Sequence, residues 1–350
     1  MKKLRYSVYL AIVLALDIFL AYSGLVNKQV SPAYAAALVY NSSDAISDVS
    51  SPKITLSPET TPSPEATLPF SVSYPTQRWG ISKIDAPKAW QISGDDQSII
   101  VAVLDTGIDK NSQDLAGRLV AEVNFTDSTT NNDVYGHGTH TASTIAVVAP
   151  GCKLMNVKVA DDAGRCEPLV VARGIIWAVD HKASIINVSL CMESSPDLEK
   201  AVNYAWEQGV VVVAAAGNRG KSQPVYPAYY VSCIAVAATN EGDSLALLSN
   251  HGDWVDVAAP GSDTYSELPD NQYGYKSGTS SAAAHVSGVA ALVFSVAIDT
   301  NGNGVINDEV RQAIENSCSP IGATGVGKGR INALKAVTET LSPSRPSPDK

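Results

Sequence analysis

Continuous runs of apolar residues, rather than alternating ones, are the main pattern in the middle of the chain. The four runs cover residues 98–104, 154–159, 185–190 and 210–215. Segments with helical spacing separate them at residues 137–148, 168–182 and 196–208. Strands that are apolar on both sides are buried on both faces, which is typical of a parallel sheet. The pattern therefore predicts a three-layer α/β fold, with a mostly parallel sheet and helices on both faces.

A further helical segment is apolar nearly all the way round. It runs from Ser280 to Phe294 without Asp, Glu, Lys or Arg, which predicts a helix buried in the core. Ser280 would lie in its first turn, where free backbone N–H groups and the positive end of the helix dipole face outward. This position suits a nucleophile whose attack creates an oxyanion. It suits a helix-capping serine equally well.

The first part of the chain has the pattern of a targeting segment. Basic residues Lys2, Lys3 and Arg5 precede an apolar run over residues 6–26 that is interrupted by Asp17. This pattern predicts that residues 1–35 form a signal peptide or an uncleaved membrane anchor, and both imply an extracellular or cell-surface protein.

The composition then divides the rest of the chain. Sixteen of the 29 residues from Asn41 to Pro69 are Ser, Thr or Pro, so residues 36–71 are predicted to be a flexible linker. Residues 72–341 would form one folded domain, and the Pro/Ser-rich residues 342–350 a disordered tail.

Charge and cysteine content exclude several classes of function. The net charge of −10 argues against nucleic acids and anionic membrane surfaces as partners. The five cysteines contain no CxxC pair, and their odd number does not indicate a disulfide framework. Neither observation identifies a chemistry, and the oligomeric state stays open.

Four polar residues are placed where an α/β sheet gathers its functional groups. Asp105 and Asn218 follow predicted strands, and His137 opens a predicted helix. Asp and Asn beside Gly are common in turns, so each is ambiguous alone. Together with Ser280 they supply an acid, an imidazole, an amide donor and a hydroxyl, as nucleophilic catalysis requires.

Two rival interpretations of these residues fail on spacing and order. His137 and His140 could share a helix face and bind a metal, but no third ligand stands at a recognisable spacing, so His140 is predicted to be a packed core histidine. An α/β-hydrolase has the order Ser, acid, His and the motif G-x-S-x-G. Here Asp105 and His137 precede Ser280, which lies in Gly-Thr-Ser-Ser-Ala.

Four short motifs in this order resemble the signatures of the subtilisin-type serine proteases. They are Asp-Thr-Gly at 105–107, His-Gly-Thr-His at 137–140, Ala-Gly-Asn at 216–218 and Gly-Thr-Ser at 278–280. The resemblance covers residues 77–338, and its N-terminal part is most similar to the thermitase-like members. It implies that His137 takes the proton of Ser280 and that Asp105 orients His137. Asn218 and the N–H of Ser280 would hold the oxyanion.

The resemblance also implies where a substrate lies. Its backbone would add as a strand between two segments, Gly164-Arg165-Cys166 and Ser189-Leu190-Cys191. Family members usually have Gly at the two cysteine positions, so the thiols are expected to narrow the cleft. A substrate strand between these segments would hold them about 9 to 10 Å apart, too far for a disulfide.

The same resemblance places a pocket for the P1 side chain. The segment from Ala214 to Gly217, which includes Ala216, would form one wall, with Val225 near its base, which favours apolar P1 residues of medium size. Arg219 at the rim is a reason to consider acidic P1 residues instead. The two preferences stay open at this point.

No cofactor is required by this chemistry, but one segment suggests calcium. Residues 299–307 resemble the first nine positions of an EF-hand or dockerin loop, with ligand positions at Asp299, Asn301, Asn303 and Val305. Position twelve is Val310, so a carboxylate ligand is missing unless Asp308 or Glu309 bends in. A plain Asn-Gly turn is the alternative.

The leading hypothesis is an exported serine endopeptidase that acts on peptides or proteins. A catalytically silent peptide-binding protein of the same fold is one alternative, because the cleft cysteines, or the lack of room for a folded pro-domain, could prevent catalysis. Four intact catalytic positions count against it. A peptide ligase that uses the same acyl-enzyme is another, and product analysis with an added amine would distinguish it.

Overall fold

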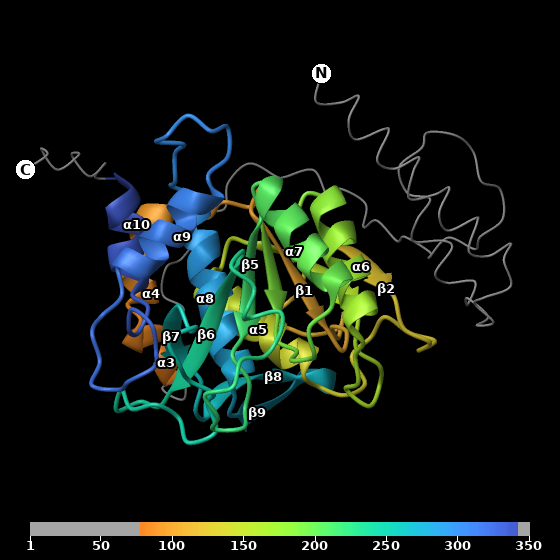
Figure 1. Cartoon of the computed structure of the whole chain (residues 1–350). Helices are drawn as coiled ribbons and strands as arrows, with labels where there is room; N and C mark the ends of the chain where they lie inside the picture. Colours follow the sequence, from red (N-terminus) through yellow and green to blue (C-terminus); the bar gives the residue numbers. More distant parts are fainter. Residues whose placement is uncertain (1–77, 342–350) are drawn as a thin grey trace, which may run out of the picture. The chain divides into compact units, whose positions relative to one another are not determined.

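The computed structural model describes residues 78–341, which contain a seven-stranded parallel sheet in the order β2-β3-β1-β4-β5-β6-β7 (Figure 1). Its strands are β1 (Ile100–Asp105), β2 (Leu119–Asn124), β3 (Lys153–Lys158), β4 (Ile185–Val188), β5 (Val211–Ala215), β6 (Cys233–Thr239) and β7 (Val257–Pro260). Two further strands, β8 (Thr264–Leu268) and β9 (Gln272–Lys276), form an antiparallel hairpin. The predicted mostly parallel sheet is confirmed.

Helices cover both faces of this sheet. They are α3 (Trp79–Lys83), α4 (Ala86–Ser93), α5 (Gly138–Val148), α6 (Pro168–Asp180), α7 (Pro196–Glu207), α8 (Thr279–Phe294), α9 (Asn307–Asn316) and α10 (Ala333–Leu341). Proline occupies the first position of α6 and of α7, where its missing N–H costs no hydrogen bond.

Alternating side chains of each strand enter two different cores. In β1, Val101 and Val103 pack into the core that contains α5 and α8. Ala102 and Leu104 pack on the other face, into the core that contains α6 and α7. This alternation follows from the two-residue period of a strand and gives the three layers that the apolar runs predict.

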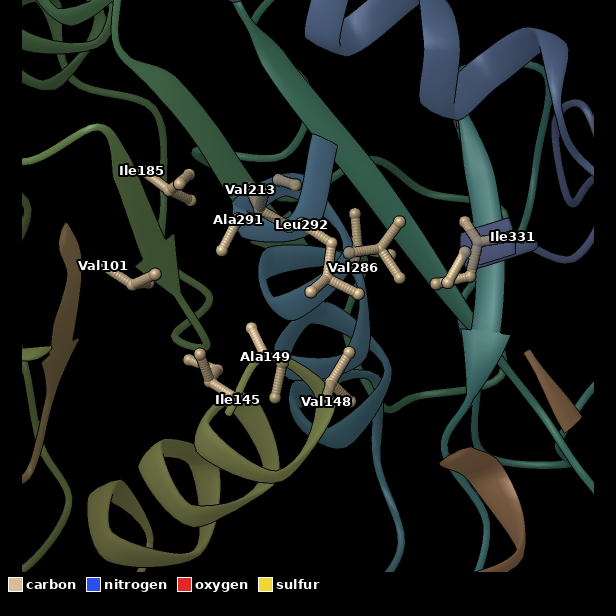
Figure 2. Close-up of a cluster of buried hydrophobic side chains, with 14 of the residues drawn as sticks. Val101, Ile145, Val148, Ala149, Ile185, Val213, Val286, Ala291, Leu292 and Ile331 are labelled. Carbon is tan, nitrogen blue, oxygen red and sulfur yellow. The ribbon is translucent and has the colours of Figure 1, made fainter. Parts of the chain in front are cut away.

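Helix α8 lies in the middle of the first core, against α5 (Figure 2). Fifteen of its sixteen residues are buried, and Ser280 is the exception. Gly288 allows the close approach of the two helices, because a Cβ there would lie 2.5 Å from Cβ of Val148. The predicted buried helix is confirmed.

Several predicted boundaries differ from the structure. Asp105 is the last residue of β1 rather than the residue after it. Strand β4 ends at Val188, so Ser189 and Leu190 lie beyond it, and Ser189 forms hydrogen bonds with Ser280 of α8 instead. The predicted leader, linker and tail (1–35, 36–71 and 342–350) lie outside the described residues, as does the start of the predicted domain at residue 72. Within residues 78–341, no helix has the length and apolar character to cross a membrane.

Candidate active site

Asp105 ends the inner strand β1 with its side chain on the α5 and α8 face, as the alternation of Val101 and Val103 requires. It is fully buried, and Oδ1 accepts hydrogen bonds from the N–H of Thr106 and from Nδ1 of His137, each at 2.7 Å. A carboxylate only accepts, so Nδ1 of His137 carries the proton and Nε2 is left as a proton acceptor.

A buried carboxylate that the sequence analysis missed fixes the loop in front of His137. Asp133 accepts hydrogen bonds of 2.8 Å from the hydroxyl of Thr106, the N–H of Gly136, and both the N–H and hydroxyl of Thr139. These bonds tie the end of β1 to the start of α5, on which His137 is the N-cap residue. A cluster of donors at 136–139, three to six residues after an Asp, is the signal that could have identified it.

Two opposing effects act on the protonation of His137. Burial favours the neutral ring and lowers its pKa. The negative charge of Asp105 and its hydrogen bond raise the pKa by more, so the net pKa lies above the usual 6.5. The imidazolium form is therefore stabilised by its orienting carboxylate.

Ser280 is the second residue of α8. Its hydroxyl donates to the carbonyl oxygen of Ser189 at 3.2 Å, and the hydroxyl of Ser189 in turn donates to the carbonyl of Ser280 at 3.3 Å. Val188, the last residue of β4, pairs with Leu104 of the neighbouring strand β1, so Ser189 and Asp105 each follow a residue of this pair. Ser280 and the Asp105–His137 pair therefore both lie at the carboxyl ends of the parallel strands. No hydrogen bond joins Ser280 to His137 within residues 78–341, since the hydroxyl is turned toward Ser189.

Asn218 follows β5 and is exposed beside the start of α8. Its Oδ1 accepts from the N–H and from the hydroxyl of Thr279, at 2.8 and 2.9 Å. Only an oxygen can accept from that N–H, so the orientation of the amide is fixed and Nδ2 remains free to donate. A Cβ at Gly278 would lie 3.1 Å from this Nδ2, so the amino group faces the turn that leads into Ser280.

The two predicted substrate segments leave the strands on either side of β1. Residues 164–166 follow β3 and residues 189–191 follow β4, so about two strand spacings separate them. Gly164 has a positive φ of 75°, and Arg165 pairs with Asp161 through Nε at 2.9 Å. Within the described part of the chain, the N–H groups of Leu190 and Cys191 have no backbone partner.

Both cleft cysteines are free thiols. Cys166 is half-buried, and burial raises its pKa to about 11. Cys191 is exposed as a residue, but its thiol turns inward and donates to the carbonyl of Ala215 at 3.5 Å. Burial, and to a smaller extent the neighbouring Cys166 thiol, raise the pKa of Cys191 to about 12. Both are neutral, protonated thiols at pH 7.

The predicted P1 wall is tightly packed. Ala216 is fully buried, and Gly217 has a positive φ of 100°. A Cβ at Gly217 would lie 2.6 Å from Nδ2 of Asn250 and 3.4 Å from Cγ2 of Val225. Only glycine fits there, and Val225 borders the same space.

His140 is not part of this group. It is 2% exposed, and its Nε2 lies 3.0 Å from the carbonyl oxygen of Thr264. Burial lowers its pKa to about 4, so the ring is neutral at pH 7. The prediction of a packed core histidine is confirmed.

Comparisons with known proteins identify the family of the chain. A model described as the subtilase family matches residues 96–337. Thermitase from Thermoactinomyces vulgaris is 42% identical over 278 residues, which are 75% of this chain and 97% of thermitase. Subtilisin BL from Lederbergia lenta is 37% identical over 273 residues, which are 74% and 97% of the two chains. A solved protease structure from Pseudoalteromonas arctica has a TM-score of 0.69 at 26% identity, covering 76% of this chain and 97% of that one.

Proposed function

Because the chain belongs to the subtilase family and is a serine-type endopeptidase, we propose that it hydrolyses peptide bonds through an acyl-enzyme on Ser280. One observation carries this assignment. The single unburied residue of the buried helix α8 is a serine, and it lies at the sheet edge where the carboxylate of Asp105 holds the ring of His137 at 2.7 Å.

The proposed reaction needs one small change in the site. The hydroxyl of Ser280 leaves the carbonyl of Ser189 and turns to Nε2 of His137, which accepts its proton as Oγ attacks the scissile carbonyl carbon. His137 then gives this proton to the leaving amine. Asp105 stays ionised and stabilises the imidazolium. A water molecule then attacks the acyl carbon while His137 takes its proton, and His137 returns this proton to Oγ of Ser280 as the acyl group leaves.

Asn218 and the start of α8 supply the oxyanion donors in this proposal. The N–H and hydroxyl of Thr279 both donate to the amide oxygen of Asn218, so the amino group of this amide points away from Thr279. The backbone N–H of Ser280 belongs to the first helical turn, whose N–H groups lack partners within the helix. Two donors at this place would stabilise the negative charge that forms in the transition state.

Replacing Asn218 with Ala is expected to lower kcat by about 10²- to 10³-fold with little change in KM, because this donor acts mainly on the transition state. Steady-state kinetics on a chromogenic peptide would measure the two constants. Asn203→Ala, at an exposed asparagine of α7, is the matched control and should keep kcat within twofold. An effect of Asn218→Ala on KM alone would remove Asn218 from this role.

We place the substrate backbone between residues 164–166 and 189–191, where it would add as a strand over the end of β1. The free N–H groups of Leu190 and Cys191 support this placement, because strand addition needs unpaired backbone groups. The side chains of Cys166 and Cys191 would flank this strand and narrow the cleft. Their neutral thiols make them apolar walls rather than nucleophiles.

For the P1 side chain, we favour apolar residues of medium size, since Val225 borders the pocket next to Gly217. Profiling with a peptide library should show this preference. Val225→Gly should raise kcat/KM for Phe or Tyr relative to Leu by about tenfold or more, because it removes a side chain from the pocket. A preference of the wild-type chain for Glu would favour the rim residue Arg219 as the determinant. A preference for Lys or Arg would contradict both assignments.

Export is the remaining part of the proposal. It rests on the basic residues and apolar run at the start of the sequence, a pattern that targets chains to the secretory route. The same pattern fits cleavage and retention as an anchor.

A further inference from the structure

Three carboxylates in the loop before α9 and in the first turn of α9 have no basic partner among the described residues. Asp299 lies in the exposed loop, and Asp308 and Glu309 lie in the first turn of α9. No ion pair between residues 78 and 341 involves any of the three. The helix dipole favours the two residues of α9, but it leaves most of this negative charge uncompensated.

The loop itself is folded around its own side-chain oxygens. The carboxylate of Asp299 accepts the N–H groups of Gly302 and Gly304, at 2.6 and 2.9 Å. The amide oxygens of Asn301 and Asn303 each accept the N–H two residues further on, at 2.9 Å. Each of these oxygens has a second lone pair, so it can also coordinate a cation.

Both carboxylates of α9 face this loop. Asp308 Oδ2 accepts from the amide groups of Asn301 and Asn303, at 2.6 and 3.1 Å. Glu309 Oε1 accepts from the N–H and the hydroxyl of Thr300, at 2.9 and 2.8 Å. Five polar side chains from the loop and the helix therefore converge.

Three consecutive side-chain oxygens at this place have no hydrogen-bond partner in the described residues although they are buried. They belong to Asn307 (Oδ1), Asp308 (Oδ1) and Glu309 (Oε2), and Glu309 is only 8% exposed. Buried polar atoms are nearly always paired, and an unpaired buried carboxylate oxygen is strongly unfavourable. A bound cation would compensate the unpaired carboxylates.

We propose that this segment binds one calcium ion. Its ligands would be the side chains of Asp299, Asn301 and Asn303, the backbone carbonyl of Val305, and the carboxylates of Asp308 and Glu309. Carboxylate, amide and backbone oxygens in a flexible loop are the ligand set that calcium prefers. Val310, at position twelve of the loop, is fully buried and apolar, so Asp308 and Glu309 take the place of the usual bidentate glutamate.

The affinity should be modest. No three His, Cys, Asp or Glu side chains of the described residues are placed to hold a metal ion as they stand, so calcium would have to draw Asp299, Asp308 and Glu309 together, and this rearrangement lowers the affinity. Sites with fewer charged ligands bind more weakly, and a dissociation constant of about 10⁻⁴ M is the value expected for an extracellular module of this kind.

The site lies at the amino-terminal ends of the parallel strands, whereas the catalytic residues lie at their carboxyl ends. Asn307 Nδ2 donates to the carbonyl of Trp206 at the end of α7, and Cγ1 of Val305 lies 2.9 Å from where a Cβ of Gly209 would be, just before β5. In Figure 1, α9 and the β8–β9 hairpin lie at opposite ends of the described part. Calcium bound here would therefore stabilise the fold without changing the rate of catalysis.

Isothermal titration of the chelator-treated full chain with CaCl₂ tests the site, in a Ser280→Ala background that limits self-digestion. The expected result is one equivalent of calcium at a dissociation constant of about 10⁻⁴ M, with at least tenfold weaker binding in Asp308→Asn and Glu309→Gln. At 10 mM, calcium should raise Tm by about 5 °C or more. In the active chain, kcat should change by less than twofold.

The matched control is Glu199→Gln, which removes an exposed carboxylate from the first turn of α7 and should leave calcium binding within twofold. Glu309→Gln could lower Tm even without calcium. The test therefore compares the change in Tm that calcium causes in each variant, and not the Tm values themselves. Three results would overturn the proposal: no binding up to 10 mM, equal affinity in Glu309→Gln and Glu199→Gln, or a change in kcat without a change in Tm.

Discussion

Replacing Ser280 with Ala should lower kcat by about 10⁶-fold, the order found when the triad serine of a subtilisin is removed. The variant keeps the buried helix α8 and the substrate segments, so KM should change little. His137→Ala should cost a similar factor, and the double variant little more, because the two residues act as one unit. Rates on a chromogenic peptide, measured with protein free of contaminating protease, would give these values.

The neighbouring Ser281 provides the control for this experiment. It is 3% exposed within α8, and its carbonyl is 2.8 Å from Nδ1 of His285. Its hydroxyl has no part in the proposed chemistry, so Ser281→Ala should keep kcat within a few-fold. Activity above 1% of wild type in Ser280→Ala, or its loss only in Ser281→Ala, would contradict the assignment of the nucleophile.

Replacing Asp105 with Asn should lower kcat by about 10⁴-fold at neutral pH, the order known for this change in a chymotrypsin-type triad. The amide of Asn can donate to Nδ1 of His137, and the ring proton would then be on Nε2. A protonated Nε2 cannot accept the proton of Ser280. The exposed Asp253→Asn is the control and should stay within twofold of wild type.

The pH profile of the same variant separates this role from a loss of structure. Catalysis needs neutral His137, so activity falls as the pH drops through the pKa of this residue. Asp105 raises that pKa, which places the acid limb of kcat/KM above pH 6.5 in the wild-type chain. In Asp105→Asn the limb should move to lower pH. An acid limb below pH 6.5 in the wild type, or one that does not move in the variant, would contradict this account.

The sequence predicted the central part of the fold because its strands are buried on both faces. Strands β1, β4 and β5 are mostly apolar, β3 is buried in five of its six residues, and helix α8 has no Asp, Glu, Lys or Arg. Strands that are buried on both faces indicate a parallel sheet covered by helices, so the fold class followed directly from the sequence. The same logic placed Asp105 and Asn218 near the carboxyl ends of strands, where the structure has them.

The strands that the sequence analysis did not identify are at or near the edges of the sheet. Edge strand β2 is partly exposed and mixes polar with apolar residues, and β7 has only four residues. Strand β6 is an exception, since all seven of its residues are buried and its apolar run was recognisable. The hairpin of β8 and β9 is short and partly exposed, so its pattern is weak.

Two of the polar residues that position the site could not be identified from the sequence alone. Thr279 and Asn250 act through hydrogen bonds to segments that the chain brings together only on folding, whereas most bonds of Asp133 are to nearby residues. Thr279 and Asn218, for example, are 61 residues apart. A pattern of residue types shows which groups are available, but it does not show which donor meets which acceptor.

Labelling with a peptidyl phosphonate that reacts with active-site serines tests the central claim most directly. The account predicts one adduct, mapped by mass spectrometry to Ser280, that is absent in Ser280→Ala and formed far more slowly in His137→Ala. An adduct on another serine, or none in a preparation that cleaves peptides, would contradict it.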